Sequence, residues 1–247
     1  MVVDVYGASD KGRVRDLNED SFCVHGFHQN QPMGFCILAD GMGGHNAGEV
    51  ASQRTVQFVA EELLKNEDLK EAPRILNRAA KSANAKVFAM AKTNQSQHGM
   101  GSTLVVACIC DDGAYIANVG DSRAYAFRNR ELMQITKDHS VVEEMVANGT
   151  ITRDEARLHP QRNIITRAIG ADADTEADIF EYDYYAGDVL LLCSDGLSSM
   201  LTDEEMLQIL TRNTDAEAMV NALIDAANER GGRDNITAIC IRFIQEG

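Results

Sequence analysis

Three apolar stretches of this sequence each end in an aspartate, where a buried strand would present a carboxylate at the edge of a sheet. An Asp-Gly pair between two apolar runs usually means a hairpin turn, and Asp112 before Gly113 needs no other interpretation. Asp40 and Asp195 differ because no apolar run returns after either, and glycines beside them let a main-chain carbonyl approach a cation closely. The three are Asp40 after 35–39, Asp121 after 116–120 and Asp195 after 189–194.

Two further acidic clusters lie near opposite ends of the chain. Glu19 and Asp20 stand together just before an apolar stretch, with Arg15 a few residues ahead of them. Asp234 lies just before the last apolar stretch, residues 236–244. Taken alone, the first cluster could be a solvated charge run and the second a plain turn. Their significance comes from the chemistry that they share with the strand-end aspartates.

All these candidate ligands are oxygen donors, with no histidine or cysteine at comparable positions, so Mg²⁺ or Mn²⁺ suits them and zinc does not. Carboxylates gathered at one place repel each other strongly unless cations lie between them. Two such ions, roughly 3.5–4 Å apart, can hold a bridging water and generate hydroxide at neutral pH. That hydroxide could attack a phosphorus atom in line, while the ions and an arginine stabilise charge on the oxygens.

The elements that must position these residues indicate an α+β layered domain. Apolar positions spaced three and four residues apart predict amphipathic helices over 76–90 and 216–227. The strands predicted at 102–110, 115–119 and 122–128 have connections too short for a crossover helix, so they must be antiparallel. This pattern excludes a doubly wound parallel sheet.

Capping residues predict the start of the helix over 216–227 and of two further helices, since a hydroxyl followed three residues later by glutamate can form a capping box. Residues 138–170, which contain one of these starts, are more polar than their surroundings and predict a helical excursion over the surface. The three pairs are Ser140 with Glu143, Thr202 with Glu205 and Thr214 with Glu217.

The composition fits one soluble domain spanning residues 1–247. The 23 basic and 38 acidic residues give a net charge of −15, which should repel nucleic acid and anionic membranes. The six cysteines lie mostly in apolar runs without a C-x-x-C pair, which predicts reduced, buried thiols. No signal peptide is evident, and no apolar run approaches the ~18–20 residues that cross a bilayer. A cytoplasmic location is therefore expected.

The motifs occur in the order seen in type 2C metal-dependent protein phosphatases, and the compact length resembles the bacterial branch of that family. The resemblance extends from about residue 6 to about residue 244. It implies a four-layer α-β-β-α sandwich of two antiparallel sheets flanked by helices, with 138–170 as a flap beside the active site. The motifs are Arg15-x-x-Asn18-Glu19-Asp20, Asp40-Gly-Met-Gly-Gly44, Gly120-Asp121-Ser122-Arg123, Ser194-Asp195-Gly196 and Asp234-Asn235.

The resemblance also implies ligands for two Mn²⁺ or Mg²⁺ ions. Asp40 would bridge the two, with the Gly41 carbonyl on one ion and Asp195 and Asp234 on the other. Asp121, together with Asp195, resembles the family's third and weaker metal site.

Three more residues take roles from the same resemblance. Arg15 matches the arginine that contacts the substrate phosphate, and its guanidinium fork suits that geometry. Glu19 and Asp20 would hold metal-bound waters or join the coordination shell. The expected catalytic set is therefore Arg15 with Asp40, Asp195 and Asp234.

One position departs from the pattern of many eukaryotic members. They place a histidine, proposed as general acid, directly after the Asp-Gly pair, whereas this chain has Met42 there. His45 is not equivalent in position, and His139 and His159 are expected to be structural.

The expected function is hydrolysis of phosphoserine and phosphothreonine in proteins, opposing a serine/threonine kinase that is itself a candidate partner, by a monomeric enzyme. A non-catalytic partner-binding module with the same fold is the alternative from another class, but such relatives typically lose a core aspartate and this chain keeps all three. A phosphatase dedicated to one regulatory partner ranks lower, because such proteins usually carry attached sensor or membrane domains.

Overall fold

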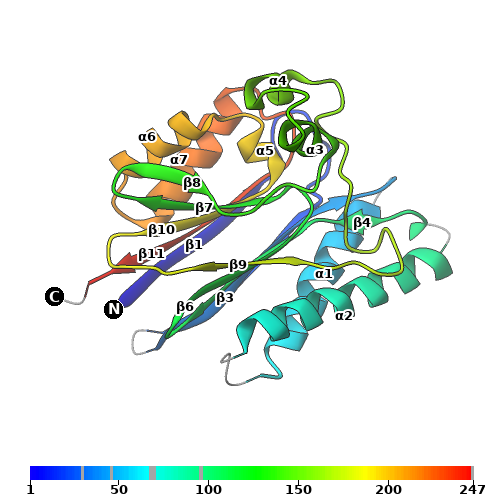
Figure 1. The fold of residues 1–247 in the computed structure, drawn as a ribbon, viewed down its shortest axis with the longest axis horizontal. Helices are drawn as coiled ribbons and strands as arrows, with labels where there is room; N and C mark the ends of the chain where they lie inside the picture. Colours follow the sequence, from blue (N-terminus) through cyan, green and yellow to red (C-terminus); the bar gives the residue numbers. More distant parts are fainter. Residues whose placement is uncertain (29–30, 45–46, 67–70, 95–96, 246–247) are drawn as a thin grey trace.

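Two antiparallel β-sheets face each other in the computed structural model, and helices cover the outer face of each sheet (Figure 1). This is the α-β-β-α sandwich that the resemblance implied. The chain enters its first strand and leaves its last at one end of the sandwich, away from the short helices α3 and α4. The structure describes residues 1–28, 31–44, 47–66, 71–94 and 97–245.

Each sheet is a single antiparallel path in which sequence neighbours are often spatial neighbours. The first has the order β1 (Val2–Asp10), β11 (Ile236–Ile244), β10 (Val189–Cys193), β7 (Arg123–Arg128), β8 (Glu131–Gln134). The second has the order β2 (Asp20–His28), β3 (Gln31–Met42), β5 (Leu104–Cys110), β6 (Gly113–Val119), β9 (Asp178–Tyr182), with the short β4 (Gly101–Ser102) paired to β3.

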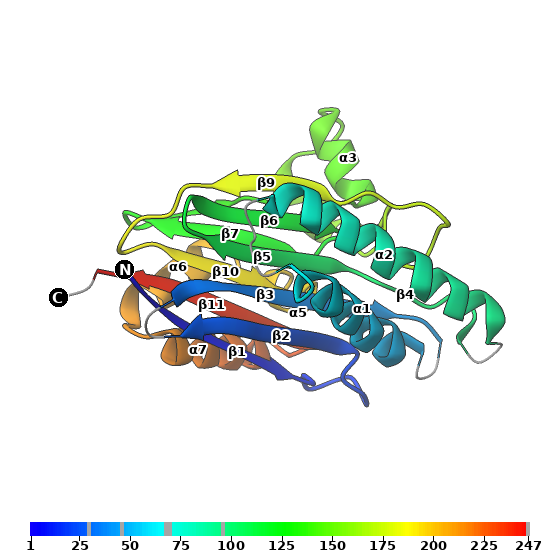
Figure 2. The same ribbon diagram turned by 90° about the horizontal axis from the view of Figure 1, so that it is seen from below.

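Helices form the two outer layers, as the view from below shows (Figure 2). The helices α1 (Ala47–Leu63) and α2 (Ala72–Thr93) lie against the second sheet, and α6 (Asp203–Arg212) and α7 (Ala216–Glu229) lie against the first. The remaining three are short: α3 (Val141–Ala147), α4 (Arg153–Leu158) and α5 (Asp195–Ser198). Residues 138–170 contain α3 and α4 and contribute no strand to either sheet.

The central strands are apolar on both faces because each sheet is covered on both sides. Successive strand side chains point to opposite faces, so Leu190 and Leu192 enter the core between the sheets. Leu191 and Cys193 pack instead under the helices of the first sheet. This explains why 189–193 is a continuous apolar run without the alternation of a half-exposed strand.

Three predicted boundaries were wrong, each for a local reason. The strand at 35–39 extends to Met42, so Asp40 lies inside β3. The strand predicted over 102–110 breaks at Thr103, whose N–H and hydroxyl bond to the main chain of Asp40 at 2.8 and 2.9 Å. Helix α7 is capped by Asp215, whose carboxylate accepts from Ala218 N, because this side chain reaches the helix N-terminus in place of Thr214.

The other capping predictions are confirmed, with a full capping box at Thr202 and Ser140 as the N-cap of α3. The six cysteines form no disulfide in the described part of the chain, and all but Cys23 are buried. Across the residues that the structure describes, no helix is both long and apolar enough to cross a membrane.

The core between the sheets should dominate stability. Leu192 is 0% exposed and Leu158, in α4, is 85% exposed. Leu192→Ala should lower the free energy of unfolding by about 2–5 kcal/mol, because it leaves a cavity between two sheets that cannot collapse. Leu158→Ala should change it by less than about 0.5 kcal/mol. Chemical denaturation of both variants checks this, and equal effects would contradict the assignment of the core.

Candidate metal centre

Carboxylates from distant segments meet at one end of the sandwich. Asp20 and Asp40 are directly paired in the register of β2 and β3. Asp195 begins α5 two residues after β10, and Asp234 lies two residues before β11, the strand that pairs with β10. The side chains of Asp195 and Asp40 lie within hydrogen-bonding reach of each other, although Asp40 lies in β3 of one sheet and Asp195 follows β10 of the other. The fold therefore gathers the core aspartates that the sequence analysis selected.

These groups raise one another's pKa values, because each is largely removed from water and faces like charges. Burial raises the pKa of Asp40 well above its ordinary value, and the charges of Asp20 and Asp195 raise it further. Burial also raises the pKa of Asp195 to about 6, with a further increase from Asp234 and a partial offset from the hydrogen bond with Asp40. In the absence of cations, part of this cluster would therefore hold protons at neutral pH.

Asp20 is buried and its two oxygens differ. Thr237 Oγ1 and Ser194 Oγ donate to its Oδ2 at 2.6 and 2.8 Å. Burial raises the pKa of Asp20 to about 7, although these two hydrogen bonds lower it. Its Oδ1 is buried and has no hydrogen-bond partner in the described part of the chain. One oxygen is thus fixed by the scaffold, which orients the other.

Glycines bring the ligand segments into contact with each other's backbone. A Cβ at Gly41 would meet the Gly48 carbonyl oxygen at 2.0 Å, and one at Gly196 would meet the Asn235 carbonyl oxygen at 1.9 Å. The sequence analysis linked these glycines to a carbonyl near a cation. The structure adds a steric requirement, because only glycine lets Asp40 lie beside helix α1 and Asp195 lie beside Asp234.

Arg15 points at the centre from the loop before β2. Its Nη2 donates to Asp234 Oδ2 at 2.8 Å, and its side chain remains 48% exposed. Asn235 anchors the loop, because its Nδ2 donates to the carbonyls of Lys11 and Leu17 at 2.9 and 2.8 Å and its Oδ1 accepts from Glu19 N at 2.8 Å. The loop residues Arg15 and Glu19 are therefore held by the residue next to Asp234.

Buried hydroxyls support the aspartates, and the sequence analysis assigned them no role. Thr103 Oγ1 accepts from Asp40 N at 2.9 Å and hydrogen-bonds to Ser122 Oγ at 2.7 Å. Ser194 and Thr237 instead donate their hydroxyls to the side-chain carboxylate of Asp20. Their signal in the sequence was a hydroxyl within or beside an apolar strand, but the partner of each lies in a distant segment.

Asp121 lies in the loop between β6 and β7, next to the same centre. Burial raises its pKa well above the ordinary value, and the charges of Asp195 and then Asp138 raise it further. Asp121 and Asp195 both line a pocket of about 380 Å³ that extends between α3, α4 and α6. The space beside the cluster is thus open toward segment 138–170.

The donor set fits hard divalent cations. Glu19 Oε1 and Asp20 Oδ1 are buried oxygens without a partner in the described residues, and Asp40, Asp121 and Asp195 keep part of their surface accessible. In the described ranges, no group of three or more Asp, Glu, His or Cys side chains is placed so that it could hold a metal ion. An ion here would therefore be held by one or two carboxylates together with waters, as Mg²⁺ commonly is.

His139 and His159 both make hydrogen bonds within the protein. His139 Nδ1 accepts from Gly120 N at 3.0 Å and its Nε2 lies 3.1 Å from Asp178 Oδ2. His159 Nδ1 accepts from Gln161 N at 3.2 Å. Met42 ends β3 and carries no transferable proton, and His45 lies outside the described residues.

Comparison with known proteins places the chain in a family. A model of the protein phosphatase 2C family matches residues 11–238. The chain belongs to this family. The serine/threonine phosphatase stp of Listeria monocytogenes is 39% identical over 236 residues, covering 94% of this chain and 93% of its own.

Solved structures of this family agree along nearly the whole chain. The serine/threonine phosphatase PstP/Ppp of Mycobacterium tuberculosis is 36% identical with a TM-score of 0.89, covering 99% of this chain and 100% of its own. The catalytic domain of PstP, solved in complex with two manganese ions, is 34% identical with a TM-score of 0.87 and 99% coverage of both chains. With its core aspartates complete, the protein is a metal-dependent protein serine/threonine phosphatase of the bacterial type, and a non-catalytic module is disfavoured.

The raised carboxylate pKa values predict an unusual pH dependence of the metal-free protein. An acid whose pKa is higher in the folded state stabilises that state below its unfolded pKa and loses this contribution as pH rises through the folded value. For Asp195 and Asp20 these folded values are about 6 and about 7. As pH rises from about 5 to about 8, the free energy of unfolding in EDTA should therefore fall, most steeply below the two folded pKa values.

The matched variant is Asp20→Asn, which keeps an oxygen for Ser194 and Thr237 but does not ionise. Its free energy of unfolding should fall less than that of the wild type over the same range. Denaturant titrations at fixed ionic strength measure both, and an identical pH dependence of the two proteins would contradict the electrostatic account.

Proposed function

We propose that the protein hydrolyses phosphoserine and phosphothreonine in proteins at the carboxylate cluster, with Asp40 bridging two Mn²⁺ or Mg²⁺ ions. The Gly41 carbonyl would complete one ion, and Asp195 and Asp234 the other. The observation that carries the proposal is the meeting of these carboxylates beside buried oxygens that have no hydrogen-bond partner among the described residues. The PstP catalytic domain, solved with two manganese ions, supports manganese as one suitable ion.

When bound, the divalent ions would neutralise the carboxylates, polarise the phosphoryl oxygens and activate water. The chain's own residues would bind the ions and their waters and keep the ligand side chains oriented. Glu19 and Asp20 offer their unpartnered oxygens to the ions or to their waters, and the hydroxyls of Ser194 and Thr237 keep Asp20 in place.

Arg15 would bind the substrate phosphate. Its exposed guanidinium pairs with Asp234, whose carboxylate could bind a cation in place of the arginine. A planar guanidinium fork matches two phosphate oxygens, and it lies where the loop opens to solvent. Met42 has no proton to give. The leaving serine or threonine oxygen must therefore be protonated by a group other than the residue after the Asp-Gly pair, which is the position proposed in many eukaryotic members.

Several finer features belong to the same proposal. Phosphorylated proteins are the substrates, and a serine/threonine kinase is among the expected partners. Asp121, with Asp195, is the proposed third and weaker ion site, and segment 138–170 is the proposed flap. A monomeric state and a cytoplasmic location also stay predictions.

Loss of the bridging carboxylate should abolish activity. Asp40→Asn should lower kcat/KM for a phosphothreonine peptide by more than ~100-fold. This exceeds the loss of ~10–100-fold that is typical when a residue that only supports a metal ligand is replaced. EDTA should abolish wild-type activity, and Mn²⁺ should restore it.

Asp112→Asn is the control for this change. It makes the same chemical replacement before a glycine, but in the β5–β6 turn, and it should keep wild-type activity. Activity in EDTA, or in Asp40→Asn with Mn²⁺, would contradict the proposed mechanism.

Replacing the phosphate-binding arginine tests the fork geometry. Arg15→Lys keeps the charge but loses the paired N–H groups, so kcat/KM should fall about tenfold or more, since a hydrogen bond to a charged group is worth about 1.5–3 kcal/mol. Arg54→Lys, on the exposed face of α1, is the control. Steady-state kinetics with a phosphopeptide measures both, and an unchanged Arg15→Lys would remove Arg15 from substrate binding.

A further inference from the structure

The backbone just before Asp121 is held from both sides by one residue. Gly120 N donates to His139 Nδ1 at 3.0 Å, and Gly120 O accepts from His139 N at 2.9 Å. Gly120 has a φ of 102°, in the left-handed region, and a Cβ there would meet Thr103 Cγ2 at 2.7 Å. Gly120 is therefore held in this backbone conformation by two hydrogen bonds to His139, and Asn118 Nδ2 also donates to its carbonyl at 3.2 Å.

The ring of His139 is itself locked. Because Nδ1 accepts an N–H, the proton of the neutral ring lies on Nε2, which donates to Asp178 Oδ2 at 3.1 Å. Arg167 Nη1 donates to the other carboxylate oxygen of Asp178 at 2.7 Å. His139 is 8% exposed, so its ring is shielded from solvent, although the Asp178 carboxylate that it contacts is 41% exposed.

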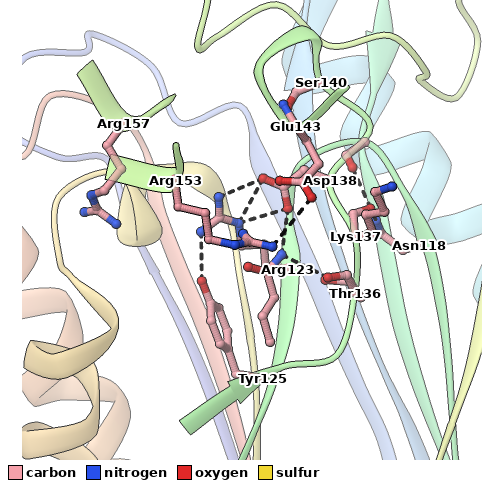
Figure 3. A network of polar contacts seen from close by, with 12 residues as sticks. Asn118, Arg123, Tyr125, Thr136, Lys137, Asp138, Ser140, Glu143, Arg153 and Arg157 are labelled. Carbon is pink, nitrogen blue, oxygen red and sulfur yellow. Dashed lines mark hydrogen bonds and ion pairs between the residues drawn. The ribbon is translucent and has the colours of Figure 1, made fainter. Parts of the chain in front are cut away.

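Arg123, two residues after Asp121 in the chain, forms an ion pair with Asp138 (Figure 3). Arg123 Nε and Nη2 donate to Asp138 at 3.0 and 2.7 Å, and Arg123 Nη1 donates to Tyr125 Oη at 2.9 Å. Gln134 Nε2 donates to Asp138 Oδ1 at 2.9 Å. All three guanidinium nitrogens are thus used within the protein, and both carboxylate oxygens of Asp138 are occupied.

We propose that His139 and the Arg123–Asp138 pair are positioning residues for Asp121. They fix residues 120 and 123 on either side of it, so that its carboxylate stays beside Asp195 in the pocket wall. A loop that is already ordered loses less conformational freedom when a ligand binds. The proposal rests on the role of Asp121 as a ligand of a third, weaker divalent ion.

The test compares three substitutions in the full-length protein. His139→Leu removes the acceptor for Gly120 N–H, whereas His139→Asn places a side-chain oxygen where Nδ1 stood. Asp138→Asn breaks the ion pair with Arg123. The probes are hydrogen exchange of the Gly120 amide without metal, and calorimetric titration with Mn²⁺.

Gly120 N–H should exchange faster in His139→Leu, and the weakest Mn²⁺ site should lose about tenfold or more in affinity in His139→Leu and Asp138→Asn, as for other residues that orient a ligand. The tighter sites should change little, and His139→Asn should behave like the wild type in both measurements.

Asp188→Asn is the matched control for general destabilisation. Asp188 pairs with Arg128, at the other end of the strand β7 that carries Arg123. This variant should keep the weak Mn²⁺ site, and a loss equal to that of Asp138→Asn would overturn the positioning role.

Asp121→Asn separates the two levels of the argument. If this variant binds as many Mn²⁺ ions as the wild type, the proposed third site at Asp121 is wrong. If it loses the weak site while His139→Leu and Asp138→Asn keep it at full affinity, the third site stands and the positioning role is overturned.

Discussion

Carboxylates that are crowded together and removed from water impose the main constraint on this molecule. Two like charges 4 Å apart repel by about 4 kcal/mol at the effective dielectric of a protein surface, and here Asp40 feels the charges of Asp20, Asp195, Asp121 and Asp234. Protons or cations must neutralise such a cluster. The protein is a metal-dependent phosphatase by family. Its fold keeps mutually repelling carboxylates close together, and this arrangement attracts cations strongly.

The rest of the fold provides the rigidity that this arrangement requires. Two sheets packed on both faces place strand ends in fixed positions, and the registry of β2 with β3 puts Asp20 opposite Asp40. Buried hydroxyls and the amide of Asn235 then fix individual side chains and the loop that carries Arg15. Packing of the sheets and helices determines where the chain segments lie, and short-range hydrogen bonds determine the positions of individual side-chain atoms.

The sequence predicted the central strands, the long helices and the aspartates of the centre, because these depend on periodicity and on residue chemistry. It did not single out β1 or β9, which are edge strands with little full burial and so lack a strong apolar pattern. The supporting contacts of Thr103, Asn235 and His139 could not be predicted, since each partner lies in a distant segment and only the fold brings them together.

The most direct measurement of the central claim is anomalous diffraction at the manganese edge from crystals grown with Mn²⁺. The account predicts two strong peaks, about 3.5–4 Å apart, between the carboxylates of Asp40, Asp195 and Asp234. Peaks only elsewhere on the molecule, with these carboxylates bonded to protein groups alone, would contradict it.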